Sequence, residues 1–143
     1  MKRVIEFKIN CIPPKSTHQS GLRIMKKRDG SQFVGKFDTG KSKKIQKELT
    51  YFFQEHTPIT PLEGPLRLMV KWVYPYRKAE PKKNLHSPIW CDTRPDCDNL
   101  VKGINDIMGR LGYYTDDGQI SHLDFQKMWA KDFGIYIKLK ELT

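Results

Sequence analysis

Two aspartates in the second half of the chain, Asp96 and Asp98, have the type and spacing of ligands to a divalent cation. In extended backbone, alternate side chains lie on the same side, so both carboxylates can turn toward one point. A helical pattern follows the pair, and the positive end of a helix favours the ionised form of both groups. Clustered ionised oxygens are the ligands that Mg²⁺ and Mn²⁺ prefer. The pair therefore predicts a Mg²⁺ or Mn²⁺ site.

The same two aspartates also have a purely structural explanation. Aspartate is among the preferred N-cap residues of α-helices, because its carboxylate accepts a hydrogen bond from a backbone N–H of the first turn. Taken alone, the pair is more typical of a helix start than of a metal site. The residues that follow it have to distinguish the two explanations.

Further charged residues continue the pattern along the predicted helix and beyond it. At about 100° per residue, Asp98, Lys102 and Asp106 lie on one helix face, opposite the apolar stripe. A second acidic pair, Asp116 and Asp117, comes just before the next predicted strand. Because Asp-Gly sequences favour turns, this second pair could shape a turn instead of binding a metal.

Lys127 breaks the alternation of the strand predicted over residues 120–130. Leu123, Phe125 and Trp129 share one face of this strand, and Lys127 points the same way. A lysine among apolar side chains has to extend its ammonium to solvent or meet a carboxylate. We favour the second explanation, because it needs only the acidic site that is already predicted.

The elements that position these residues follow from the hydrophobic pattern. Alternation predicts strands over residues 4–10, 66–72, 120–130 and 133–139, and a hairpin with strands at 22–25 and 32–37 around Asp29-Gly30. Helical spacing predicts one helix capped by Thr39 or Ser42 and a second between Pro95 and Gly112. This order predicts a single α+β domain over residues 1–143, with two helices packed on one mixed, largely antiparallel sheet. The Pro-rich stretch at about 75–95 is predicted to be a long surface loop.

The charge balance favours a polyanionic partner. The 143 residues include 26 Lys and Arg against 16 Asp and Glu, a formal net charge of +10. Each DNA phosphate that a cation neutralises releases a condensed counterion, which makes DNA a suitable partner, with a basic protein that has no such partner as the alternative. The candidate DNA contacts are the basic residues in and around the predicted loop: Lys15, Arg77, Lys78, Lys82, Lys83 and Arg94.

Other classes of protein are disfavoured by the sequence. No apolar run approaches the length of a membrane span, and the first residues lack the apolar stretch of a signal peptide. Cys11, Cys91 and Cys97 include no CxxC pair and no zinc-like spacing, so they are interpreted as reduced thiols. These features predict a cytoplasmic protein without membrane contact.

The charged positions together resemble the signature of the RusA family of Holliday junction resolvases. That signature reads D-x-D-N-L-x-K, then D-A-L, then a D-D pair that opens a strand, then K. The chain follows its order and spacing with Asp96-Cys97-Asp98-Asn99-Leu100-Val101-Lys102, Asp106-Ile107, Asp116-Asp117 and Lys127, and Ile12-Pro13-Pro14 is similar to the end of the family's first strand. The chain departs from the pattern at Cys97, where an aliphatic residue is usual, and at residues 91–95, which are less basic and follow a longer loop.

The resemblance implies a homodimeric crossover junction endodeoxyribonuclease that makes paired nicks in four-way DNA junctions with Mg²⁺ or Mn²⁺. Its essential carboxylates correspond to Asp96, Asp98 and Asp117, which would hold the metal, and its functional lysine corresponds to Lys102. The residues expected to support this site are Asp106, Asp116 and Lys127. No small-molecule cofactor is expected. Two alternatives stay open: a non-catalytic nucleic-acid-binding protein, and a nuclease that acts on flaps or forks.

Overall fold

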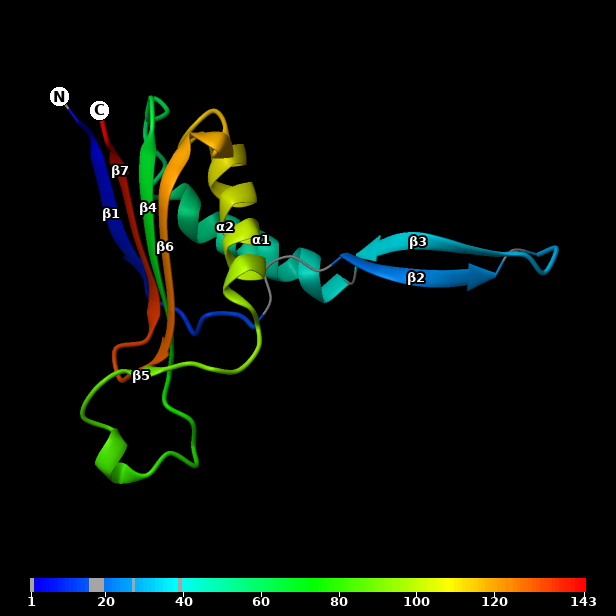
Figure 1. Ribbon diagram of the computed structural model, residues 1–143, viewed down its shortest axis with the longest axis horizontal. Helices are drawn as coiled ribbons and strands as arrows, with labels where there is room; N and C mark the ends of the chain where they lie inside the picture. Colours follow the sequence, from blue (N-terminus) through cyan, green and yellow to red (C-terminus); the bar gives the residue numbers. More distant parts are fainter. Residues whose placement is uncertain (1, 16–19, 27, 39) are drawn as a thin grey trace.

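A computed structural model describes residues 2–15, 20–26, 28–38 and 40–143. Its main body is a five-stranded sheet with two helices on one side, and a two-stranded hairpin extends away from this body (Figure 1). The strands are β1 (Val4–Ile9), β2 (Ser20–Lys26), β3 (Gln32–Asp38), β4 (Leu66–Tyr74), β5 (Ile89–Trp90), β6 (Ile120–Trp129) and β7 (Gly134–Glu141). The helices are α1 (Gly40–Gln54) and α2 (Cys97–Leu111), with two 3₁₀ turns, η1 (Lys82–Asn84) and η2 (Asp117–Gln119).

The main sheet has the strand order β1-β7-β4-β6-β5. β4 and β6 are parallel, while the other neighbouring pairs are antiparallel. Parallel neighbours need a crossover connection, and the segment that contains α2 provides it between β4 and β6. α2 and β6 consequently run in opposite directions (Figure 1). The prediction of an α+β fold with one mixed, largely antiparallel sheet and two packed helices is confirmed.

The core lies between the sheet and the helices. Leu68, Val70 and Trp72 of β4 are at most 1% exposed, and Ile104 and Ile107 of α2 are fully buried against the same cluster. Burying one such side chain contributes about 1.5–3 kcal/mol relative to leaving it exposed. The apolar stripe of the predicted second helix therefore fixes α2 on the sheet and leaves its charged face outward.

The helix ends test two predictions about caps. Gly112 ends α2 in the left-handed region at φ 91°, and its N–H donates to the Met108 carbonyl at 3.1 Å. A side chain would be strained at this positive φ, so the predicted role of Gly112 is confirmed. The predicted cap at Ser42 is wrong, because α1 begins at Gly40, and the alternative cap, Thr39, lies outside the described residues. Neither described helix has the length and apolar composition needed to cross a membrane.

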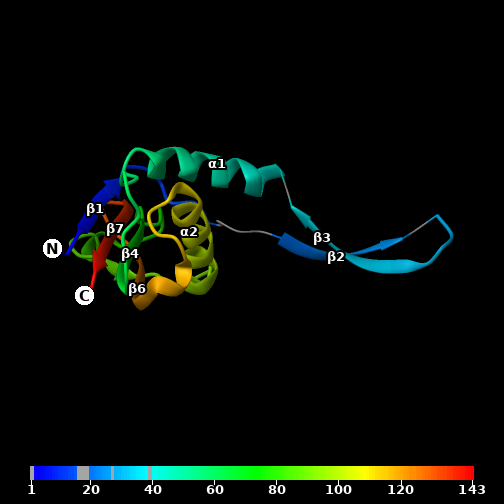
Figure 2. The same ribbon diagram turned by 90° about the horizontal axis from the view of Figure 1, so that it is seen from above.

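The hairpin and the long loop follow the sequence to different degrees. β2 and β3 pair around the predicted turn, where Gly30 has φ 89° and the Asp29 carboxylate accepts a hydrogen bond from the Ser31 N–H at 2.9 Å. They form a sheet of their own that points away from the main body (Figure 2). The stretch at 75–95 is more regular than predicted, because it contains η1 and β5, and β5 pairs with the end of β6.

Candidate active site

The carboxylate of Asp96 does not cap the helix that it precedes. Asp96 occupies the N-cap position of α2 with φ −75° and ψ 145°, but its side chain makes no capping hydrogen bond. Asp98 lies in the first turn of the helix, and both residues are exposed. An N-cap role would engage the Asp96 carboxylate with an N–H of that turn. The purely structural explanation of the pair therefore loses support, and ligand binding gains it.

Lys127 holds the backbone segment that leads into the aspartate pair. Its Nζ donates to the carbonyl oxygens of Thr93 and Pro95, the latter at 2.6 Å. The Lys127 carbonyl also accepts a hydrogen bond from the Cys91 N–H at 3.1 Å. The sequence predicts an ammonium that extends to solvent or meets a carboxylate. The structure corrects this: the ammonium binds backbone carbonyls, because β6 runs back along α2 and brings Lys127 beside the segment before that helix.

The ammonium groups of Lys127 and Lys102 lie near the two carboxylates at the start of α2. Burial raises the pKa of the Cys97 thiol, while the nearby Lys127 ammonium acts in the opposite direction. Since Cys97 stands between Asp96 and Asp98 in the chain, Lys127 lies close to this pair. Lys102 is exposed on α2 four residues after Asp98, a spacing at which helical side chains are neighbours.

The second acidic pair lies at the other end of α2, and its two members differ in their surroundings. The Asp116 side chain accepts a hydrogen bond from the Gly118 N–H at 2.8 Å, and Gln119 Oε1 accepts one from the Asp116 N–H at 3.1 Å. This reciprocal arrangement is a capping box, so Asp116 shapes the turn as the structural alternative predicts. Asp117 is the first residue of η2 and is exposed.

Asp106 lies near Asp117, toward the end of α2, and not near the aspartate pair at the start of this helix. Burial raises the pKa of Tyr114, and the negative charges of Asp117 and Asp106 raise it further, so both carboxylates lie near this tyrosine. The Tyr114 hydroxyl donates to Asn105 Oδ1 at 2.7 Å, which ties the last turns of α2 to the chain that follows. The predicted polar face of the helix is thus exposed as expected. Asp98 and Lys102 lie toward the start of α2, whereas Asp106 lies toward its end.

The predicted metal ligands consequently lie near opposite ends of α2 within one protomer. α2 contains 15 residues, which at 1.5 Å per residue corresponds to about 22 Å. Asp96 and Asp98 lie at its start, and Asp117 is the first residue of η2, which follows its end. Among the described residues, no three His, Cys, Asp or Glu side chains are arranged to hold a metal ion. The three carboxylates do not form one ligand set in a single protomer, and their assignment stays a prediction.

Most of the predicted DNA contacts gather in one hollow beside the start of α2. This basic hollow has a volume of about 350 Å³ and includes Thr93 in its lining, close to the aspartate pair. Its basic residues are Lys15, Arg77, Lys78 and Arg94. The Arg77 guanidinium lies 4.0 Å from the centre of the Trp129 ring, which keeps one of these cations in place. Lys82 and Lys83 lie elsewhere, exposed in η1.

Known proteins are similar in sequence to most of this chain. A family model described as endodeoxyribonuclease RusA matches residues 11–140. The chain belongs to the RusA endodeoxyribonuclease family. It is 30% identical over 146 residues to the crossover junction endodeoxyribonuclease rusA of Lactococcus phage r1t, an alignment that covers 99% of this chain and 100% of the phage protein. It is also 29% identical over 115 residues to the uncharacterized protein YqaN of Bacillus subtilis (strain 168), which covers 74% of this chain and 78% of that protein.

The match to the RusA family includes every candidate residue, from Lys15 to Lys127. The resemblance drawn from the second half of the sequence is therefore confirmed, and it extends through the hairpin and α1. Membership of this family makes the chain an endodeoxyribonuclease.

An exposed tryptophan near the site, Trp90, is not predicted by the sequence pattern. Trp90 lies on β5, in the segment that leads to Asp96, and is 69% exposed. Aromatic side chains can stack on unpaired bases, so an exposed tryptophan in a basic segment is a signal for nucleic-acid binding. The stretch at 75–95 has no hydrophobic periodicity that would distinguish an exposed tryptophan from a buried one. The exposure of Trp90 is therefore evident only from the structure.

Replacing Lys127 with Met is expected to destabilise the segment before α2. The variant keeps an apolar stem of similar length but removes both hydrogen bonds to the Thr93 and Pro95 carbonyls, at a cost of about 1–2 kcal/mol in the free energy of unfolding. Urea unfolding followed by circular dichroism measures this loss, with Lys131→Met at an exposed turn position as the control. Equal stability of both variants would show that Lys127 does not hold this segment.

Proposed function

We propose that this RusA protein is a crossover junction endodeoxyribonuclease that resolves Holliday junctions in the cytoplasm by paired hydrolysis with Mg²⁺ or Mn²⁺. The observation that carries the proposal is the pair of exposed carboxylates at the start of α2, beside the basic hollow and with no capping bond from Asp96. A divalent ion bound there would activate a water molecule and polarise the scissile phosphate. The phage relative, which is named a crossover junction endodeoxyribonuclease and matches over its full length, supports this choice of substrate.

The side chains around the pair have complementary roles in this proposal. Asp96 and Asp98 hold the ion, and the cations of the basic hollow bind phosphates of the strand that is cut. Lys102, exposed on the next turn of α2, offsets the negative charge that grows on the phosphate during attack. Lys127 keeps the segment before Asp96 in position through its hydrogen bonds to two backbone carbonyls.

The active form in this proposal is a homodimer in which each site combines residues of both protomers. The Asp96–Asp98 pair and Asp117 are separated by the length of α2 in one chain. A two-fold dimer can place one protomer's Asp96–Asp98 pair beside the partner's Asp117, and the symmetry then creates two equivalent sites. Two such sites suit a four-way junction, in which two opposed strands have to be cut.

An endonuclease assay on a panel of DNAs tests the proposed function. With Mg²⁺, we expect paired nicks at symmetric positions of a synthetic four-way junction and little cutting of a linear duplex. Ca²⁺ is expected to support junction binding without efficient cutting, because it prefers more ligands and a looser geometry than Mg²⁺. Gel-shift and denaturing-gel measurements on the same samples separate binding from cleavage.

The two alternatives give different results in the same assay. Junction binding without cleavage in any divalent ion would favour a non-catalytic nucleic-acid-binding protein. Preferred cutting of flaps or forks would keep the nuclease and reject the junction as its main substrate. Equal cutting rates in Mg²⁺ and Ca²⁺ would contradict tight positioning of the attacking water.

A further inference from the structure

The side of the main sheet that faces away from the helices carries a second concentration of positive charge. α1 and α2 lie on one side of this sheet (Figures 1 and 2). Because side chains alternate along a strand, residues between the buried ones point to the opposite side. On β4, Leu68 and Val70 are buried in the core, whereas Met69 and Lys71 face the other way. This opposite side is called the open face below.

Cations outnumber carboxylates on the open face. The strand registers place there the basic residues Lys8, Arg67, Lys71, Lys138 and Lys140, and the acidic residues Glu6 and Asp124. Arg67 lies directly opposite Lys140 in the pairing of β4 with β7. Like charges at opposed positions destabilise a sheet. Glu6 lies opposite Lys138 in the pairing of β1 with β7, but no carboxylate lies opposite Arg67 or Lys140 in the pairing of β4 with β7. Stability of the sheet therefore does not explain the Arg67–Lys140 pair, and an anionic partner would.

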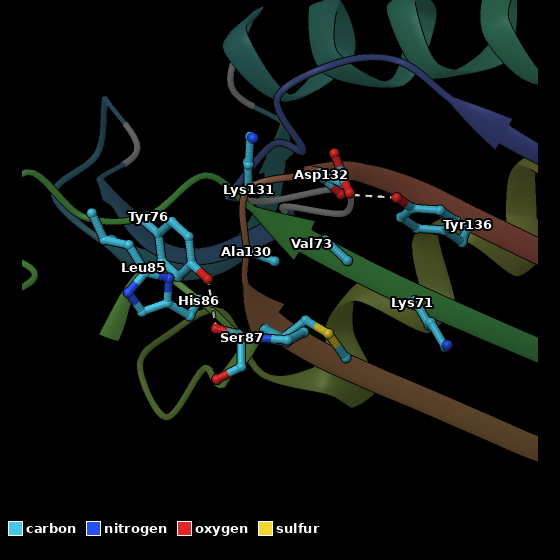
Figure 3. A pocket seen from close by; sticks show the side chains of 12 residues that line it. Lys71, Val73, Tyr76, Leu85, His86, Ser87, Ala130, Lys131, Asp132 and Tyr136 are labelled. Carbon is cyan, nitrogen blue, oxygen red and sulfur yellow. Dashed lines mark hydrogen bonds between the residues drawn. The ribbon is translucent and has the colours of Figure 1, made fainter. Parts of the chain in front are cut away.

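Two adjoining hollows give the open face a continuous track. The first, of about 390 Å³, includes Lys8, Lys71, Tyr136 and Lys138 in its lining, with Lys8 Nζ 5.1 Å from the centre of the Tyr136 ring. The second, of about 420 Å³, shares Lys71 and Tyr136 and adds Lys131 from the turn after β6. Figure 3 shows Lys71 and Lys131 on separate segments around this second hollow. The track therefore passes from β1 across β7 and β4 to the turn between β6 and β7.

We infer that the open face binds the sugar–phosphate backbone of a duplex arm of the DNA substrate. Duplex DNA carries one negative charge per about 1.7 Å of its axis, so it can neutralise a row of cations. A second copy of this chain fits less well, because two-fold packing of two open faces would bring cations against cations. The inference rests on the proposed function in taking DNA as the substrate, but it concerns a surface on the other side of the sheet from α2.

Two matched triple variants test the open face. The open-face variant replaces Lys71, Lys138 and Lys140 with Gln, and the α1 variant replaces the exposed residues Lys43, Lys44 and Lys47 with Gln. Both variants lose the same formal charge, from opposite sides of the sheet. Binding of the full chain to a four-way junction and to a short linear duplex is measured in Ca²⁺ over a series of salt concentrations, with the thermal midpoint as the control for folding.

The open-face variant is expected to bind both DNAs on the order of 10²-fold more weakly near physiological salt. The slope of log K against log salt should fall by about 0.9 for each phosphate that this variant no longer neutralises, whereas the α1 variant should keep the wild-type slope. Equal losses of affinity in the two variants would overturn the inference in favour of net charge alone. Tighter self-association of the open-face variant would overturn it in favour of a second copy of the chain.

Failure of the inference can be told apart from failure of the proposed function. A wild-type protein that cuts junctions, together with an open-face variant that binds like it, rejects the open face and leaves the nuclease intact. A wild-type protein that neither binds nor cuts DNA rejects both.

Discussion

Protomers with Asp98→Asn and protomers with Asp117→Asn are expected to recover cleavage when they are mixed, although neither variant cuts alone. Each substitution removes one carboxylate at nearly constant shape. Loss of a residue that only supports a metal ligand lowers activity by up to about 10²-fold. Loss of a direct ligand should therefore lower the cleavage rate by at least about 10²-fold. If each site takes the Asp96–Asp98 pair from one protomer and Asp117 from the other, a heterodimer of the two variants keeps one intact site. Its second site carries both substitutions.

The mixture should therefore nick one strand of a junction and rarely cut two. Random exchange of protomers makes about half of the dimers heterodimers, so about a quarter of the wild-type number of sites stays intact. A denaturing gel with each junction strand labelled in turn measures this, since it separates single nicks from paired ones. A site built within one protomer gives no recovery, because every protomer in the mixture lacks one ligand.

A second mixture serves as the matched control. Asp96→Asn combined with Asp98→Asn places both substitutions in the same carboxylate pair, so every site in the heterodimer stays damaged. Junction binding by all three variants should survive or tighten, because each removes repulsion between a carboxylate and a phosphate. Absence of recovery in the mixture of Asp98 and Asp117 variants would rule out sites shared between protomers in this way. Recovery in the control mixture would contradict the assignment of Asp96 and Asp98 to one carboxylate pair.

Local signals in the sequence predict the elements of this fold well. The buried face of α2 follows from apolar residues at helical spacing, and its end follows from Gly112, because both depend on residues only a few positions apart. The hairpin follows in the same way from Asp29-Gly30 between two alternating segments. The open face of the sheet is also implicit in the alternation of β4 and β7, but its charge becomes evident only when the strands are placed side by side.

The sequence does not predict the contacts between distant parts of the chain. Alternation places Lys127 on the helix side of β6, but its partners depend on β6 being the parallel neighbour of β4 and ending beside residues 91–95. The motif groups Asp117 with Asp96 and Asp98 by order and spacing. Spacing along the chain gives no distance in space, and a straight helix of 15 residues holds these carboxylates apart in one protomer. The oligomeric state decides whether they meet.

Lys102→Met is expected to abolish most cleavage while leaving the fold and junction binding nearly unchanged. Lys102 is exposed on α2, four residues after Asp98, on the face opposite the core. If the aspartates only begin a helix, Lys102 is an exposed partner of Asp98 whose loss changes little. If they bind metal beside a scissile phosphate, its ammonium opposes the charge that grows in the transition state. Removing one preorganised electrostatic interaction of this kind costs on the order of 10²-fold or more in rate.

Single-turnover cleavage at saturating protein measures this effect without a contribution from substrate affinity. We expect Lys102→Met to keep the thermal midpoint and to bind the junction within a few-fold of wild type, and Lys102→Arg to restore part of the rate because it keeps the positive charge. Lys47→Met, at an exposed position of α1, is the control for loss of one surface charge. A Lys102→Met protein that cuts at the wild-type rate would remove this residue from the catalytic site. Loss of both junction binding and cleavage in Lys102→Met would show that Lys102 is a DNA-binding residue. A charge that acts only in the transition state does not contribute to ground-state affinity.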